Sequence, residues 1–315
     1  GGVLCAALLS SCSEVEGVEY MSYKKIRHGD RIKDGKGWFS AAFLAPSLAL
    51  YTCLIIAPIL LAVFYSLTKW NGIGAPTFIG FASDEYWVCF KNTLTCIGWS
   101  LLVQISLGLI LAYLLYTTKI GYRFFRSVFF LPAVISPAAI GTMFLIFFNG
   151  ELGPLNSFLT SIGLSKLAMN WLSDSRTVLY AVMFPMIWQY IGHYILIFLA
   201  GIQTIPEEIF ESAKIDGANS FQIFFHMVVP MVLDLIGTCI VLCFTGSVKA
   251  FDQAYVMTAG GPGVRSSYLA IEMYKTAFTE NKLGLGIAIA ITMLVLSLVF
   301  TLLFNRFRAR IAPED

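Results

Sequence analysis

Side chains able to perform acid–base, nucleophilic or metal chemistry are few in this 315-residue chain, and they are not grouped. Its three histidines and seven cysteines are spread along the sequence, with no C-x-x-C pair and no Cys/His cluster. No Ser/His/Asp or paired-carboxylate arrangement stands out, and the phosphate-binding pattern G-x-x-x-x-G-K-[ST] does not occur. The sequence therefore predicts no catalytic residue, no metal site and no nucleotide site in this chain.

Uncharged polar side chains within apolar stretches are the residues best suited to bind a solute. Gln189, Tyr190, Tyr194 and Thr245 interrupt two such stretches. They offer hydrogen-bond partners and aromatic faces, which suit a neutral solute such as a sugar. A second interpretation, hydrogen bonds between helices or aromatic anchors at a membrane interface, applies to each of them and is left open. His193 is expected to be a packed histidine rather than a ligand.

The elements that must position these residues are membrane-spanning helices. The chain is 57% hydrophobic and 13% charged, with a mean hydropathy of +0.76. A soluble domain carries roughly 25% charged residues, so this composition excludes an ordinary water-soluble globule. A spanning helix needs about 20 apolar residues. Six stretches qualify: 39–68, 93–117, 127–148, 178–202, 229–248 and 284–305.

The distribution of Lys and Arg predicts the side of the membrane that each loop occupies. Basic residues are concentrated in segments 22–37, 118–126 and 306–310. With six spans, these segments lie on one face together with the polar loop 203–227. We therefore expect an all-α integral membrane protein whose two termini and polar loop are cytoplasmic.

The chain divides into an N-terminal extension with a basic tail at 1–37, a six-helix transmembrane domain at 38–308, and a tail at 309–315. The tetrapeptide L-S-S-C that ends at Cys12 looks like a lipoprotein cleavage box. Lipidation there, however, would place the basic tail outside and invert every loop. We therefore expect residues 1–20 to be an upstream extension, with Met21 as the natural start.

The most informative pattern lies between the fourth and fifth spans. Residues 211–230 read E-S-A-K-I-D-G-A-N-S-F-Q-I-F-F-H-M-V-V-P. This stretch resembles the EAA loop of ABC-transporter permeases, E-A-A-x3-G-x9-I-x-L-P, with every fixed spacing kept and three conservative departures. Acids after Pro206, a glycine at 217 and a capping residue at 219 or 220 predict a short helix–turn–helix within the EAA-like loop 205–230. An ordinary amphipathic connector is the alternative, and the fixed spacings argue against it.

Other stretches extend the resemblance over about 38–308. F-F-R-S-V-F-F-L-P at 124–132 is similar to the F-R-x-x-x-x-x-P segment of carbohydrate-uptake permeases. F-D-Q-A-Y-V-M-T-A-G-G-P-G at 251–263 resembles the F-D-x-x-Y-x-x-T-x-G-G-P signature of the same group, and Asn92-Thr93 fits its first loop. The chain thus resembles the maltose-type and glycerol-phosphate-type branch of type I ABC importer permeases.

The resemblance implies a permease subunit of a binding-protein-dependent importer in a bacterial inner (plasma) membrane. Such a subunit is not an enzyme. It couples ATP hydrolysis by a partner ATPase to alternating access. It implies no cofactor in this chain, with ATP and Mg bound by partner ATPase subunits. The implied partners are a second homologous permease, two ATPase subunits and an extracytoplasmic solute-binding protein, together with membrane lipid and without nucleic acid. The residues that it assigns to ATPase coupling are Glu211, Ser212, Ala213, Asp216, Gly217 and Pro230.

Two other functions remain as alternatives. One is an ABC permease for a solute that is not a sugar, such as a polyamine or phosphate. The other is an ion-coupled secondary transporter, which usually carries membrane-buried carboxylates and internal repeats. The predicted spans offer only Asp234, near the start of one of them, and no clear repeat. The sequence does not name the solute.

Overall fold

The computed structural model describes residues 36–69, 77–78, 84–118 and 121–311. The sequence predictions for the extension at 1–20 and for most of the basic tail at 22–37 fall outside these residues. By its internal contacts the chain separates at Ala57 into two parts, which are taken in turn. The first contains α2 (Lys36–Tyr51) and a π-helical turn (Thr52–Ile56), and α3 (Ala57–Ser66) continues from it.

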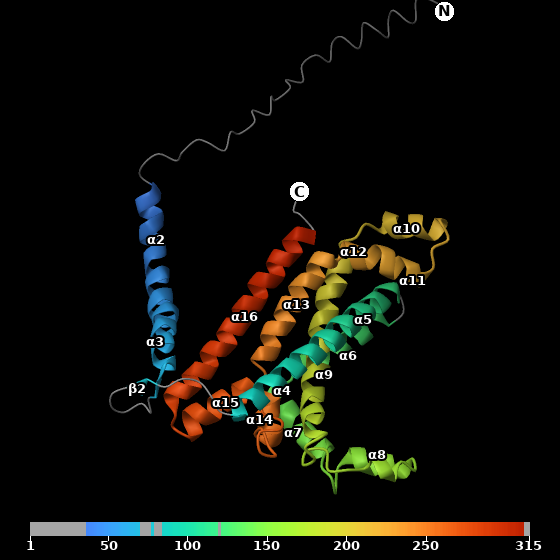
Figure 1. The fold of residues 1–315 in the computed structure, drawn as a ribbon. Helices are drawn as coiled ribbons and strands as arrows, with labels where there is room; N and C mark the ends of the chain where they lie inside the picture. The colour runs from blue at the N-terminus through green and yellow to red at the C-terminus, as the bar shows by residue number, and fades with distance from the viewer. Residues whose placement is uncertain (1–35, 70–76, 79–83, 119–120, 312–315) are drawn as a thin grey trace, which may run out of the picture. The chain divides into compact units, whose positions relative to one another are not determined.

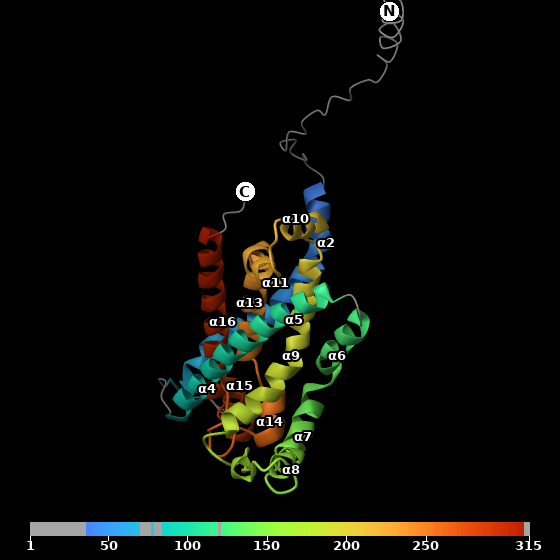
Figure 2. The same cartoon turned by 90° about the vertical axis from the view of Figure 1, so that its right-hand side faces the viewer.

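The second part is built from helices and one minimal hairpin. The antiparallel hairpin pairs β1 (Thr68–Lys69) with β2 (Thr77–Phe78). The helices, which Figures 1 and 2 label, are α4 (Asp84–Ser100), α5 (Ser106–Thr117), α6 (Tyr122–Val134), α7 (Pro137–Phe147), α8 (Pro154–Ser161), α9 (Val178–Ile202), α10 (Glu207–Ile215), α11 (Ser220–Ile223), α12 (Val229–Met231), α13 (Leu233–Val248), α14 (Asp252–Thr258), α15 (Leu269–Tyr274) and α16 (Leu283–Ile311). Short π-helical or 3-10 turns lie at Leu101–Ile105, Ser165–Leu167, Phe224–Val228 and Lys275–Thr279.

Five helices of the described residues are long and apolar enough to cross a membrane, and a sixth crossing is formed if α6 and α7 count as one broken span. The fourth expected span matches α9 at both ends. The third expected span, 127–148, is not one helix, because the chain bends by 94° between α6 and α7. Pro137 explains the break, since a residue before proline is pushed out of the helical region and Ser136 has a ψ of 131°. The fold is otherwise the all-α membrane architecture that the sequence predicts.

Helix α9 lies at the centre of the packing. It contacts α5 along most of its length and α6 on another side. Small residues allow these close approaches, because a Cβ on Gly108 of α5 would lie 2.8 Å from the Cβ of Tyr194, and a Cβ on Gly192 would meet the carbonyl of Phe129. The largest buried apolar cluster runs along α5 and α9 and continues into α10, α11 and α13.

The loop helices α10 and α11 lie at the opposite end of the second part from α8. Figures 1 and 2 both show α10 and α11 at one end, where α16 also finishes, and α8 at the other. The irregular segments that join α7 to α8 and α14 to α15 lie at the same end as α8. The polar EAA-like loop and the F-D…G-G-P signature are therefore at opposite ends of the helices.

Candidate functional site

The EAA-like loop forms a helix–turn–helix. Helix α10 ends at Ile215, and two residues later Gly217 has a φ of +80°, the left-handed conformation that glycine adopts freely. Its amide bonds to the carbonyl of Lys214, and the Ala218 amide bonds to that of Ala213, which is the standard glycine-terminated helix end. Asn219 then caps α11 through a reciprocal pair of bonds with Gln222, at 2.8 and 2.9 Å.

Aromatic side chains of α5 fix the loop to the spanning helices. The ring of Tyr113 lies 5.1 Å from that of Phe224, and the ring of Tyr116 lies 5.2 Å from that of Phe210. The Tyr113 hydroxyl also donates to the carbonyl of Ser220 at 3.1 Å. Sequence analysis did not single out these tyrosines, because nothing in the pattern of α5 shows that its end meets the loop. The loop is thus rigidly joined to α5.

The outer face of the loop exposes both acidic and apolar side chains. Glu211, Ser212, Asp216 and Gly217 are exposed, and Ala213 is buried against the helices. Ile215 is 86% exposed and Phe221 is 69% exposed, which is unusual for large apolar side chains. Their exposure leaves an apolar surface beside the acidic residues.

Pro230 lies elsewhere than the sequence suggested. The fifth span was expected at 229–248, which places Pro230 at its start, but Pro230 lies within the short helix α12, and α13 begins only at Leu233 after a break at Val232. Proline has no N–H to close a helical bond. The π-helical turn at 224–228 that precedes it accommodates the irregular backbone.

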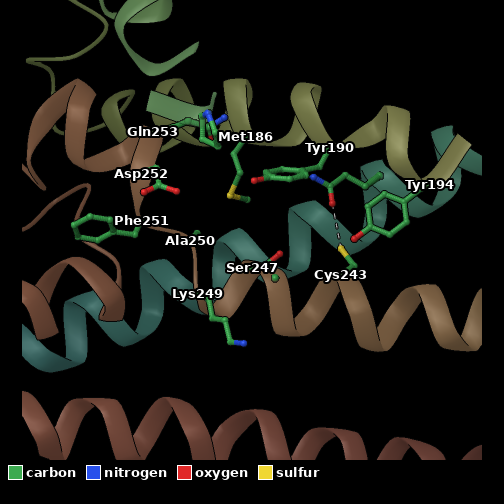
Figure 3. Close-up of a pocket in the computed structure, with 13 residues that line it drawn as sticks. Met186, Tyr190, Tyr194, Cys243, Ser247, Lys249, Ala250, Phe251, Asp252 and Gln253 are labelled. Carbon is green, nitrogen blue, oxygen red and sulfur yellow. Dashed lines mark hydrogen bonds between the residues drawn. The ribbon is translucent and has the colours of Figure 1, made fainter. Parts of the chain in front are cut away.

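A cavity of about 240 Å³ opens between α9 and the junction of α13 with α14. Figure 3 shows Tyr190 and Tyr194 extending from α9 toward Cys243 and Ser247 of α13. Phe251 and Asp252 lie at its α14 end, and Gln104 joins the lining from the π-helical turn between α4 and α5. Aromatic rings, amides, hydroxyls and the charged side chains of Lys249 and Asp252 therefore surround a space between the spanning helices.

The four solute-binding candidates lie in three different settings. Tyr190 and Tyr194 line the cavity. Gln189 is 1% exposed, is not among the lining residues, and donates from Nε2 to the carbonyl of Ile135 at 2.8 Å. Thr245 lines a separate, mainly apolar groove between α13 and α16. His193 packs against the rings of Phe130 and Tyr190, as a structural histidine would.

Gln104, Ser247 and Asp252 are cavity residues that sequence analysis did not propose as solute contacts. Gln104 bridges two spans, since its Nε2 donates to the Ile187 carbonyl at 3.3 Å and its Oε1 accepts from the Cys243 thiol at 3.2 Å. The polarity of Gln104 within an apolar run was the available signal. Among the described residues, no group of three or more His, Cys, Asp or Glu side chains is placed to hold a metal ion.

At the opposite end from the loop, Asn92 joins α4 to the G-G-P signature. Its Nδ2 lies within hydrogen-bond distance of three carbonyls, those of Val264 at 3.3 Å, Arg265 at 2.9 Å and Ser267 at 3.0 Å. The neighbouring Thr93 accepts from the amide of Leu269 at 3.0 Å. Two motifs about 170 residues apart thus form one structural unit.

Glu272 extends this unit as a buried carboxylate. It is 6% exposed, and the thiol of Cys89 lies 3.7 Å from its Oε2. Burial, together with the nearby carboxylate of Glu85, raises the pKa of Glu272 above its ordinary value. The protonated form of this side chain is therefore favoured by its surroundings.

Comparison with known proteins assigns the chain to a family. The family model described as "Binding-protein-dependent transport system inner membrane component" matches residues 104–313. The chain is 36% identical over 275 residues to the probable ABC transporter permease protein YurN of Bacillus subtilis, covering 84% of this chain and 94% of the relative. It is 31% identical over 273 residues to the probable starch degradation products transport system permease protein AmyD of Thermoanaerobacterium thermosulfurigenes, covering 83% and 90%.

A solved structure supports the fold. A chain of a bacterial ABC transporter involved in the import of the acidic polysaccharide alginate superposes with a TM-score of 0.76 at 22% identity, covering 88% of this chain and 97% of that one. At this identity the likeness concerns the fold alone. The family model and the relatives above 30% identity show the family. The chain is a multi-pass membrane protein that belongs to the binding-protein-dependent transport system inner membrane components, the permeases of ABC importers.

Proposed function

We propose that this chain is the permease subunit of an ABC importer for a carbohydrate, an oligosaccharide or a sugar derivative. The cavity between the spanning helices, lined by Tyr190, Tyr194 and Gln104, is the observation that carries the proposal. Sugars bind through hydrogen bonds and by stacking on aromatic faces, and this lining supplies both kinds of contact. The relatives whose names specify a sugar agree with this class of solute.

Tyr190 and Tyr194 are the residues proposed to contact the solute. Their side chains lie on one wall, with Ser247 opposite and Asp252 at one end. The volume of about 240 Å³ is below the roughly 300–1,000 Å³ of ordinary ligand pockets. A second, homologous permease beside this chain would enlarge the route, and the proposal includes such a partner.

Energy for transport is proposed to come from ATP hydrolysed by separate ATPase subunits, which bind ATP and Mg. The EAA-like loop is their docking surface, with Glu211 and Gly217 on its outer face and Ile215 as an apolar contact. Because ATP is in the cytoplasm, the loop and both termini are proposed to lie on the cytoplasmic side. The end that carries the G-G-P signature then faces an extracytoplasmic solute-binding protein.

The ion-coupled alternative requires a carboxylate within the spans, because carriers driven by H⁺ or Na⁺ usually place carboxylates at membrane depth. Asp234 does not meet this requirement, since it lies in the first turn of α13, at the end of the span. Asp252, in the first turn of α14, lines the cavity and is the carboxylate that this alternative would use. Uptake measured with a protonophore therefore decides between the two functions.

Uptake by proteoliposomes separates the candidate functions. The permease pair, its ATPases and a solute-loaded binding protein are reconstituted, and a panel of labelled oligosaccharides, polyamines and phosphate is tested. We expect ATP-dependent uptake of a sugar that a protonophore leaves unchanged at constant ATP. Abolition of uptake by the protonophore would favour the secondary transporter, and uptake of a polyamine or phosphate alone would refute the carbohydrate assignment.

A further inference from the structure

We infer that Gln189 and Gln253 are positioning residues, whose paired side-chain amides hold the two helix breaks that end the cavity. The inference rests on the proposed function, because it concerns the solute route of that transporter. It also revises the role of Gln189, which was first considered as a solute contact.

Two interruptions of the spanning helices meet beside the cavity. One separates α6 from α7 at Ile135 and Ser136, and the other separates α13 from α14 at residues 249–251. Pro137 lines the cavity from the first break, and Phe251 lines it from the second. A broken helix leaves carbonyl groups without helical partners, and at membrane depth each of these needs another donor.

Gln189 supplies such a donor and links the two breaks. Its Nε2 donates to the carbonyl of Ile135 at 2.8 Å, at the first break. Its Oε1 accepts from the Nε2 of Gln253, in the first turn of α14 just after the second break. The two side chains are 1% and 5% exposed, so bulk water has little access to either bond.

Helix α14 is also held from the side of α7. A Cβ on Gly141 would lie 3.1 Å from the Cα of Gln253 and 3.2 Å from its carbonyl oxygen, so the two backbones are in direct contact. Gln253 is thus confined between Gly141 and Gln189. Because Phe251 and Asp252 precede it directly, any shift of α14 moves these two cavity residues.

The pair therefore sets the shape of the cavity rather than binding the solute. Gln189 is absent from the cavity lining, and Gln253 lines the cavity at the α14 end, where its Nε2 is bonded to Gln189 instead of facing the solute. A solute ligand would discriminate between solutes. A positioning residue would change the transport of all of them by one factor.

Substitution by methionine tests this inference, because methionine keeps the length of glutamine and removes both hydrogen-bonding groups. The variants are Gln189→Met, Gln253→Met and the double variant, with Thr292→Val as control. Among the described residues, Thr292 bonds within its own helix alone, to the carbonyl of Ala288 at 2.9 Å. Uptake of two sugars of different length is measured in proteoliposomes, at equal amounts of inserted protein.

We expect Gln189→Met to lower the uptake of both sugars by the same factor, about tenfold, equivalent to roughly 1.4 kcal/mol for leaving buried groups unpaired. The double variant should be no more impaired than Gln189→Met, because both changes remove one linkage. Gln253→Met keeps the bond to Ile135, and it replaces Gln189→Met if that variant does not insert. Thr292→Val should match the wild type.

Three results would overturn the inference: wild-type uptake by Gln189→Met, multiplicative losses in the double variant, or an altered preference between the two sugars. Thermal unfolding of the purified chain in detergent tests the pair without transport. The melting temperature should fall no further in the double variant than in Gln189→Met, and additive falls would contradict the pairing. If the wild-type complex imports no sugar, the proposed function fails while the unfolding result still decides the pairing.

Discussion

Substitution of Gly217 tests the role of the EAA-like loop most sharply. The φ of +80° at this position costs an ordinary L-residue about 1–2 kcal/mol, which is roughly 5- to 30-fold in the equilibrium between the native and the opened turn. A Cβ at Gly217 meets none of the described residues within 4 Å, so no clash adds to the cost. Membrane insertion should therefore survive any substitution here.

Three variants separate backbone strain from size. Gly217→Ala adds strain with a small side chain. Gly217→Asn adds a larger side chain, but asparagine tolerates the left-handed region. Gly217→Asp adds a side chain of nearly the same shape as asparagine that carries a negative charge. Because the space around Gly217 is open in this chain, a larger side chain would project toward the ATPase, and we expect Asn and Asp to be more harmful than Ala.

The assay is co-purification of the ATPase subunits with the permease, followed by solute-stimulated ATP hydrolysis at equal membrane levels. Glu211→Ala is the comparison, since an exposed ion pair contributes about 1 kcal/mol or less. We expect Gly217→Asp to lose both signals while Glu211→Ala keeps most of them. Wild-type association and stimulation in Gly217→Asp would refute the coupling role, and greater damage by Ala than by Asn would assign the effect to the turn itself.

Three further outcomes are expected. A cysteine replacing Ser157 should react with an impermeant reagent from outside, and one replacing Lys214 only after permeabilisation; the reverse pattern contradicts the proposed orientation. Asn92→Leu should destabilise the chain by several degrees in thermal unfolding, since three carbonyls lose one donor, while Thr95→Val, which loses only an intrahelical bond, should not. The raised pKa of Glu272 means that its ionisation opposes folding, so stability should fall as pH rises from its ordinary pKa to the raised one. Glu272→Gln should remove that fall and raise the melting temperature at neutral pH, and an unchanged pH profile would refute this assignment.

The spanning helices and the loop were predictable because their signals are local. A run of about 20 apolar residues specifies a span without reference to the rest of the chain. The boundaries of α9 match the prediction for that reason. The Gly217 turn and a cap at 219 or 220 were likewise predicted from residues within one or two turns, and the structure places the cap at Asn219.

The break between α6 and α7 was missed although prolines marked it. Hydropathy stays high across residues 127–148, so composition alone indicates one span. The bend depends on Pro137 forcing Ser136 out of the helix and on Gln189, from another span, satisfying the freed carbonyl. The second condition is tertiary, and no pattern within the third span shows it.

The solute cavity was only partly predictable for a similar reason. Tyr190 and Tyr194 were identified because they are polar residues in an apolar helix, but the same criterion selected Gln189 and Thr245. The direction that each side chain faces depends on how α9 and α13 are rotated against their neighbours. Gln104 lies in a π-helical turn, which changes the direction in which its side chains point. The hydropathy pattern of the span does not indicate such a turn.

ATP hydrolysis by purified protein tests the central claim, that this chain is a permease driven by another subunit. The chain alone, free of contaminants and in lipid, should hydrolyse no ATP. Adding the ATPase subunits should produce hydrolysis that the solute-loaded binding protein increases. Specific ATP turnover by the chain alone would contradict the account.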